Sequence, residues 1–248
     1  MGLPRSREMI PLSAETGNAL DVSNTDLMVA LDETERPELL RELIAISRQT
    51  FGFFQRHMIA YPWLIEHLEA LPRSARILDV GAGLSPVPVW LAHRGYRVIC
   101  IDKAGRIYRP PARPDWNAWG FFEYGLVHPN LAAYNVSVAD YGPTQHLDAI
   151  YAAGALAHMP ARARDRALSR LPGWMLPGGV FLAIVDLVQG TELLWNGGPN
   201  NQVEPRERHG TITDILDRLT TAGFGIDEQR TVVRPNHFTD LFLVRCTR

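Results

Sequence analysis

The segment Ile77–Asp102 constrains the fold of this chain most strongly, because it carries a strand, a glycine turn, a helix and a second strand in succession. An apolar run leads into Gly81-Ala82-Gly83, and glycine allows a tight turn and a close approach of the backbone to a ligand. Ser85 is a favourable helix cap, and Pro86 suits the first helical position. The helix is expected to stop at Gly95. This order predicts a parallel α/β sheet.

The same segment predicts a ligand site. Free N–H groups at the start of the helix favour a carboxylate or a phosphate. The strand 98–101 ends at Asp102, whose carboxylate can accept hydrogen bonds from both ribose hydroxyls. A dinucleotide fingerprint requires glycine or alanine where this chain has Pro86, and a Gly-Lys-Ser/Thr phosphate loop is absent. The pattern indicates an adenosine cofactor, and these departures disfavour a dinucleotide or a nucleoside triphosphate.

Short β-rich runs alternate with helical segments through the rest of the chain. The runs are Arg76–Val80, Arg97–Ile101, Ala133–Val138, Asp148–Ala152 and Val180–Val185. Apolar strands that are joined through helices indicate a parallel sheet covered on both faces. Near the C-terminus, Phe224–Val233 and Asp240–Cys246 are separated by a short turn, so we expect an antiparallel hairpin at one edge.

Three regions are predicted along the chain. Residues 1–24 are polar, contain two prolines and show no periodicity, so we expect a partly disordered arm. Residues 25–74 have helical spacing, with apolar side chains such as those of Leu39, Leu40, Leu43 and Ile44 on one face. They are expected to form a helical cap. Residues 75–248 form the α/β domain.

Composition excludes several classes of function. The chain has 248 residues, a net charge of −2 and acidic and basic residues mixed along its length, which disfavours nucleic-acid binding. No run approaches the roughly 20 apolar residues of a membrane span, and the N-terminal residues do not resemble a signal peptide. Cys100 and Cys246 lie in apolar runs, as expected for buried reduced thiols in a cytoplasmic protein. The oligomeric state is left open.

Four motifs in order carry a family resemblance. They are Leu78–Pro86, Asn135–Asp140, Leu147–His158 and Leu176–Leu182, followed by Gly223-Phe224 and the terminal hairpin. Over about residues 75–248 the chain resembles the class I S-adenosylmethionine-dependent methyltransferases. Ser85 stands where many members have a third glycine, and helix capping accounts for this difference.

The resemblance implies a Rossmann-like sheet of seven strands with the last antiparallel, and S-adenosylmethionine as cofactor. Gly81 and Gly83 would pass its methionine part, Asp102 would hold the ribose, and Asp140 would contact the adenine. The cofactor-binding set that it implies is Gly81, Ala82, Gly83, Ser85, Asp102, Lys103, Asp140, Ala152 and Ala153. Asp140 can also be read as a turn residue before Gly142-Pro143.

Acceptor specificity is expected in two long connections, 103–131 and 187–209, because long loops at this edge of a sheet are commonly functional. Four aromatic side chains of these connections are expected to border the acceptor pocket, those of Trp116, Trp119, Tyr124 and Trp195. Packing of the same rings into a local core is the alternative.

His158 is the candidate general base, with a histidine bonded to backbone beside Pro160 as the alternative. His209 and His237 are secondary candidates that are expected to be exposed turn residues. No metal site is predicted, because no recognised ligand spacing is present.

The predicted function is methyl transfer from S-adenosylmethionine to an oxygen or nitrogen of a small molecule, including a natural product or a carrier-bound compound. Two alternatives remain open. One is a nicotinamide-dependent Rossmann reductase, and the other is a catalytically degenerate methyltransferase fold that acts as a binding subunit.

Overall fold

The computed structural model describes residues 36–51, 59–104, 106–107, 120–197, 202–234 and 239–248, and its centre is a seven-stranded sheet. In spatial order the strands are β5 (Leu131–Asn135), β2 (Arg97–Asp102), β1 (Arg76–Val80), β6 (Leu147–Ala153), β7 (Met175–Val188), β9 (Thr239–Thr247) and β8 (Gly225–Val232). The neighbours from β5 to β7 pair in parallel, and β9 pairs antiparallel with both β7 and β8. The predicted Rossmann-like methyltransferase sheet with a reversed last strand is confirmed.

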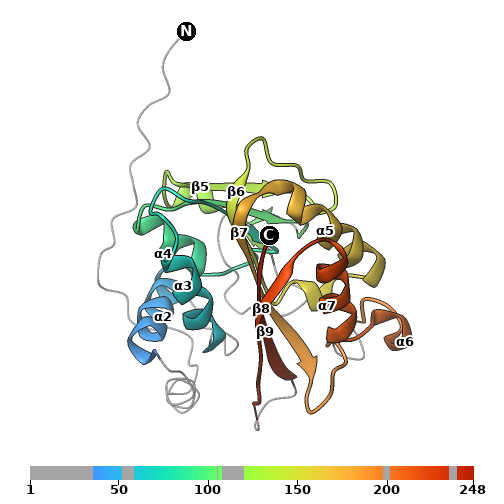
Figure 1. The fold of residues 1–248 in the computed structure, drawn as a ribbon. Coiled ribbons are helices and arrows are strands. Elements are labelled where there is room, and N and C mark those ends of the chain that lie inside the picture. The colour runs from blue at the N-terminus through green and yellow to red at the C-terminus, as the bar shows by residue number, and fades with distance from the viewer. Residues whose placement is uncertain (1–35, 52–58, 105, 108–119, 198–201, 235–238) are drawn as a thin grey trace.

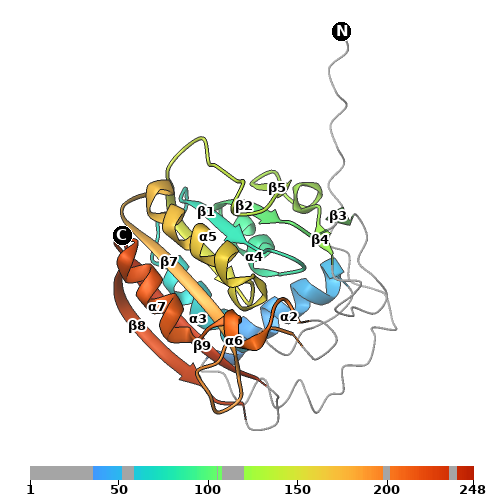
Figure 2. The ribbon, with the colours of Figure 1, turned by 90° about the vertical axis from the view of Figure 1, so that its right-hand side faces the viewer.

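Helices cover both faces of the sheet (Figure 1). One face carries α2 (Pro37–Phe51), α3 (Tyr61–Glu69) and α4 (Val87–His93), and the other carries α5 (Ala161–Trp174) and α7 (Ile212–Thr221). Figure 2 views the sheet from the side of α5 and α7. Neighbouring residues of β1 point into different layers, because Ile77 belongs to the core under α2–α4 and Leu78 to the core under α5 and α7. Strands buried on both faces explain the nearly continuous apolar runs.

The N-terminal helices share the core of the α/β domain. Leu40 and Leu43 of α2 are fully buried in the same cluster as Ile77. Glu42 of α2 accepts hydrogen bonds from the Trp90 indole of α4 at 3.0 Å and from Arg94 at 2.8 Å. Burial opposes ionisation of Glu42, but these donors outweigh it and lower its pKa. Helices α2 and α3 lie within the predicted cap, and the predicted arm 1–24 lies outside the described residues.

Two strand predictions differ from the structure. The run predicted at 133–138 is displaced, because β5 ends at Asn135 and the chain then turns, with the backbone N–H of Asp140 donating to the Ser137 carbonyl at 2.9 Å. The Ser137 hydroxyl accepts from the N–H of Ala139, and such local hydrogen bonding competes with strand pairing. The run predicted at 180–185 is the middle of the longer β7.

Short elements fill several of the connections. They are β3 (Arg106–Ile107), which pairs in parallel with β4 (Phe121–Phe122), two 3-10 helices, η2 (Tyr124–Leu126) and η3 (Leu156–His158), and the helical turn α6 (Arg206–His209). The part of the chain that is described contains no helix long and apolar enough to cross a membrane. The carboxyl ends of β1, β2, β6 and β7 meet at one edge of the sheet, which is where open α/β sheets bind ligands.

Candidate functional site

The glycine turn after β1 adopts a backbone conformation that favours glycine. Gly81 has φ of 75° and Gly83 has φ of 45°, both in the left-handed region. The N–H of Gly81 donates to the Ile101 carbonyl of β2 at 2.9 Å. A Cβ on Gly81 would lie only 2.4 Å from the Cβ of Ala155 in the connection after β6. The turn is therefore held between the ends of two neighbouring strands.

Asp102 connects the end of β2 to this turn. Its Oδ2 accepts from the N–H of Gly83 at 3.0 Å, and its Oδ1 accepts from the N–H of Ala104 at 2.7 Å. Burial raises the pKa of Asp102, and the backbone donors of Ala104, Gly83 and Lys103 oppose that shift. A carboxylate has about four acceptor sites in total, so a site remains for a ligand beside these three backbone donors.

Tyr124 supports the glycine turn through its hydroxyl group. Its ring is fully buried, and its hydroxyl accepts from the N–H of Ser85 at 2.7 Å. The carbonyls of Ala82, Gly83 and Ser85 lie within 3.0–3.2 Å of the same hydroxyl and can receive its proton. Contrary to the expectation that Tyr124 borders the acceptor pocket, it contributes nothing to the cavity lining.

Tyr124→Phe is expected to lower the free energy of unfolding by about 0.5–1.5 kcal/mol, because the Ser85 N–H loses the shorter of its two hydrogen bonds and keeps only the Ala82 carbonyl at 3.2 Å. Denaturant unfolding measures this loss. Tyr134→Phe is the matched control, because Tyr134 is 50% exposed and its change should have little effect. If Tyr124→Phe is as stable as wild type but binds an acceptor more weakly, Tyr124 contacts the acceptor as the sequence predicted.

A cavity of about 490 Å³ opens beside the turn. One part is bordered by residues 81–85, 101–104 and 136–139. The other part has aromatic and polar walls, formed by Tyr61, His158, Asp186, Trp195 and Thr239. Its volume lies within the roughly 300–1,000 Å³ typical of small-molecule sites.

Most of the cofactor-binding residues named from the sequence line this cavity. They are Gly81, Ala82, Gly83, Ser85, Asp102, Lys103 and Ala153. The N-cap of α4 is Pro86, one residue later than predicted, although the Ser85 hydroxyl still accepts from the N–H of Val87 at 3.3 Å.

Five of the predicted site residues are placed elsewhere or are not described. Asp140 is exposed and borders a separate depression with Tyr134 and Tyr141, because the chain turns after β5. Ala152 faces the core under α5, since successive strand residues alternate. Trp116 and Trp119 lie outside the described residues, as does His237.

His158 and Trp195 both reach the cavity. Their rings meet edge to face, with centroids 5.2 Å apart. Burial, together with the nearby His209, lowers the pKa of His158 to about 4. His158 is therefore uncharged at neutral pH and is a weak proton acceptor there.

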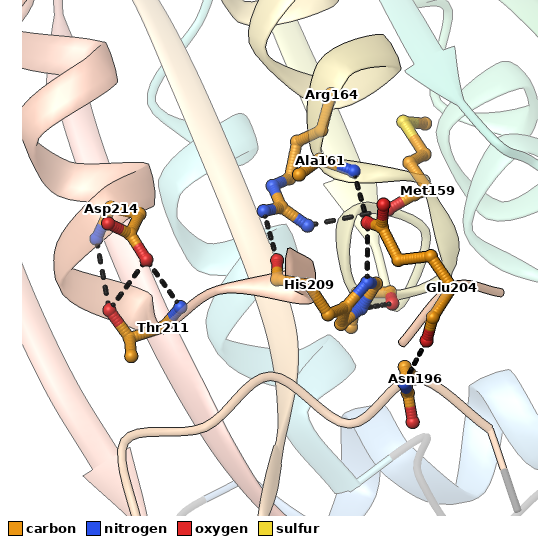
Figure 3. Close-up of polar contacts among 9 residues, drawn as sticks. Met159, Ala161, Arg164, Asn196, Glu204, His209, Thr211 and Asp214 are labelled. Atoms are coloured by element: carbon orange, nitrogen blue, oxygen red, sulfur yellow. Dashed lines mark hydrogen bonds and ion pairs between the residues drawn. The ribbon is translucent and has the colours of Figure 1, made fainter. Parts of the chain in front are cut away.

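His209 is buried, in contrast to the exposed turn residue that was expected. Its Nδ1 lies 3.1 Å from Glu204 Oε1, and its Nε2 lies 2.7 Å from the Ala157 carbonyl (Figure 3). Glu204 Oε1 also accepts from the N–H of Ala161 at the start of α5, and the Asn196 amide donates to the Glu204 carbonyl at 3.0 Å. These contacts fix the segment after Trp195 against the connection that carries His158.

Three titratable residues of the cavity were assigned no role from the sequence. Tyr61 begins α3, and its hydroxyl shares a hydrogen bond with the Ser85 side chain. Asp79 of β1 accepts from the Tyr151 hydroxyl at 2.8 Å, and burial raises the pKa of Asp79 well above its usual value. Asp186 stands near the carboxyl end of β7. An acid at the end of an apolar strand, the signal that identified Asp102, would also have identified Asp186.

Within the described residues, no cluster of three or more histidine, cysteine, aspartate or glutamate side chains is arranged to hold a metal ion.

Comparison with known proteins supports the same architecture. No protein-family model matches the sequence. The S-adenosyl-L-methionine-dependent Diels-Alderase iliD from Neonectria sp. (strain DH2) is 29% identical over 101 residues, a match that covers 36% of this chain and 41% of that relative. The chain therefore spans less than half of the curated relative that it matches.

Two solved structures share the fold over most of their length. The 1,6-didemethyltoxoflavin-N1-methyltransferase of Burkholderia thailandensis, solved with its namesake ligand and S-adenosylhomocysteine, aligns with a TM-score of 0.58 and 18% identity over 100% of this chain and 98% of its own. The [4+2]-cyclase SpnF aligns with a TM-score of 0.57 and 14% identity over 88% and 96%. This chain has the fold of the class I S-adenosylmethionine-dependent methyltransferases.

Proposed function

We propose that this chain binds S-adenosylmethionine and transfers its methyl group to an oxygen or nitrogen of a small-molecule acceptor. The proposal rests on one continuous cavity, which joins the glycine turn and Asp102 to a chamber with polar and aromatic walls. Direct displacement requires both reactants to be aligned in one enclosed space.

The cofactor part of the cavity fits an adenosine ligand. The left-handed glycines leave no side chain between the turn and the cavity, and the Asp102 carboxylate keeps an acceptor site beside its backbone donors. When bound, S-adenosylmethionine supplies an electrophilic methyl group. Ser137 and Val138, rather than Asp140, border the cavity after β5, so we assign them the adenine side.

The acceptor part of the cavity lies around Tyr61, Asp186 and Trp195. These side chains enclose the space and can exclude water from the reacting atoms. The enclosed volume and the absence of a strong positive net charge favour a small molecule over nucleic acid.

Cyclisation is the second candidate function. It is suggested by the Diels-Alderase that matches part of the sequence and by the [4+2]-cyclase that shares the fold. Such a reaction would use the same enclosed chamber, but it would leave the cofactor's methyl group in place.

Calorimetric titration tests the cofactor assignment. We expect S-adenosylmethionine and S-adenosylhomocysteine to bind and NADH not to bind. Binding of NADH alone would favour the reductase, and failure of every adenosine ligand would favour a degenerate binding subunit. Incubation of acceptor candidates with methyl-labelled cofactor then separates the two chemistries. Methyl transfer releases one S-adenosylhomocysteine for each product, whereas cyclisation releases none.

A further inference from the structure

Asp186 lies within the sheet at the acceptor part of the cavity. It belongs to β7, which pairs with β6 on one side and β9 on the other. Its side chain is 14% exposed and borders the cavity. An acidic side chain in such a position needs partners or a function, because burial of an unpaired charge is costly.

The two carboxylate oxygens of Asp186 have different surroundings. Oδ1 lies 3.5 Å from both Arg234 Nη2 and Thr239 Oγ1. Oδ2 has no hydrogen-bond donor among the described residues. It faces Gly154, where a Cβ would lie 3.5 Å away. Since Gly154 carries no side chain, Oδ2 is open to the cavity.

The partners of Oδ1 are themselves fixed. Arg234 Nε donates to the Thr239 carbonyl at 2.9 Å, and the Arg234 N–H donates to Asp240 Oδ1 at 3.0 Å. The Arg234 guanidinium and the Thr239 hydroxyl are also hydrogen-bonded. Asp186 is therefore held in place from the side of β9, while its other oxygen points to the ligand space.

The titratable groups around Asp186 come from several elements. Tyr61 of α3 and His158 of η3 are uncharged at neutral pH, because burial raises the pKa of Tyr61 and lowers that of His158. Arg234, after β8, is the cation. Burial raises the pKa of Asp186 to about 6, and Arg234 and Thr239 oppose that shift. Asp186 is thus ionised above about pH 6 and able to take a proton near neutral pH.

We propose that Asp186 binds the methyl acceptor through Oδ2 and removes its proton, so that the natural acceptor is an uncharged molecule with an N–H or O–H group. This inference rests on the proposed function. The acceptor's lone pair forms the bond to the methyl carbon, and the carbon–sulfur bond breaks with its electron pair staying on sulfur. The acceptor's proton passes to Oδ2 and then to solvent. An anionic acceptor would be repelled by the same carboxylate.

Binding of simple probes to the S-adenosylhomocysteine complex tests the proposal without the natural acceptor. Phenol and pyrazole serve as uncharged donors, and benzoate serves as an anion. We expect the donors to bind wild type, with affinity that rises through about pH 6. Asp186→Asn should weaken this binding by about tenfold or more, which is the scale of one lost hydrogen bond to a charged group. It should also remove the pH dependence and improve benzoate binding.

Three further variants separate blockage of the cavity from backbone strain and from the loss of any carboxylate. Gly154→Ala would place a methyl group beside Oδ2 and should weaken probe binding. Gly178→Ala is its control, because Gly178 has φ of 77° against 76° for Gly154 and has open space around it. Asp227→Asn, on β8 and away from the cavity, controls for loss of a carboxylate.

The outcomes distinguish the two proposals. Failure of the wild-type protein to bind S-adenosylhomocysteine would contradict the proposed function itself. If that ligand binds but neither donor probe does, the role of Asp186 is overturned. The role of Asp186 is also overturned if Asp186→Asn binds the donor probes as tightly as wild type does. The same holds if wild type binds benzoate as tightly as it binds phenol. Normal cofactor affinity with selective loss of donor probes in Asp186→Asn supports it.

Discussion

Gly81→Ala is expected to lower the free energy of unfolding by about 2–5 kcal/mol and to weaken S-adenosylhomocysteine binding by more than tenfold. The left-handed φ of 75° costs an alanine roughly 1–2 kcal/mol. The new methyl group would also stand 2.4 Å from Ala155 Cβ, and overpacking of this kind typically adds about 1–3 kcal/mol. Relief of the clash must move the glycine turn or the wall of the cavity.

Gly178→Ala provides the comparison for this result. Gly178 has nearly the same φ, 77°, but a Cβ there would meet nothing within 4 Å. It should therefore show only the conformational cost, with cofactor affinity unchanged. Chemical denaturation and calorimetric titration of both variants measure the two effects. If the two variants lose the same stability and have the same cofactor affinity, the close approach of Gly81 to Ala155 has no consequence.

Asp102→Ala is expected to weaken S-adenosylhomocysteine binding by about 1.5–3 kcal/mol, because the ribose hydroxyls lose a charged acceptor. The structure adds a stability cost, since the N–H groups of Gly83 and Ala104 lose their acceptor as well. A lower melting temperature should thus accompany the loss of affinity, whereas the position of Asp102 in the sequence alone predicts little effect on folding.

Asp140→Ala is the matched control for Asp102→Ala. Asp140 was predicted to contact the adenine, but it is exposed and lies outside the cavity. Its removal should leave both affinity and melting temperature unchanged. If Asp140→Ala weakens binding as much as Asp102→Ala does, the adenine contact inferred from the family resemblance would be restored.

The sequence predicts the centre of this site well because its signals are local. A strand, a glycine turn and an acid at the next strand end lie within 26 consecutive residues, Ile77–Asp102. Local sequence is enough there, because adjacent parallel strands bring the turn and Asp102 together.

Other parts of the site depend on information that is not local. A strand buried on both faces lacks the alternation of polar and apolar residues that shows which side chains point to which face. The sequence pattern alone therefore does not tell which of Ala152 and Ala153 faces the cavity. The direction of the Tyr124 ring is set by packing against residues 82–85, about 40 positions earlier in the chain. His209 is buried by Ala157 of η3 and Arg164 of α5, which lie far from it in the sequence.

The position of β9 has a consequence for the order in which the sheet assembles. Among the described strands, β8 is hydrogen-bonded only to β9, and β9 pairs with β7 along the whole span from Val188↔Thr239 to Val180↔Thr247. During synthesis β8 therefore emerges before the strand that must separate it from β7. Until β9 has left the ribosome, β7 presents an unpaired and apolar edge to which other strands, including those of neighbouring nascent chains, can add. Strand β8 can therefore join the sheet only together with β9 or after it, so the edge beyond β7 stays incomplete until β9 is available.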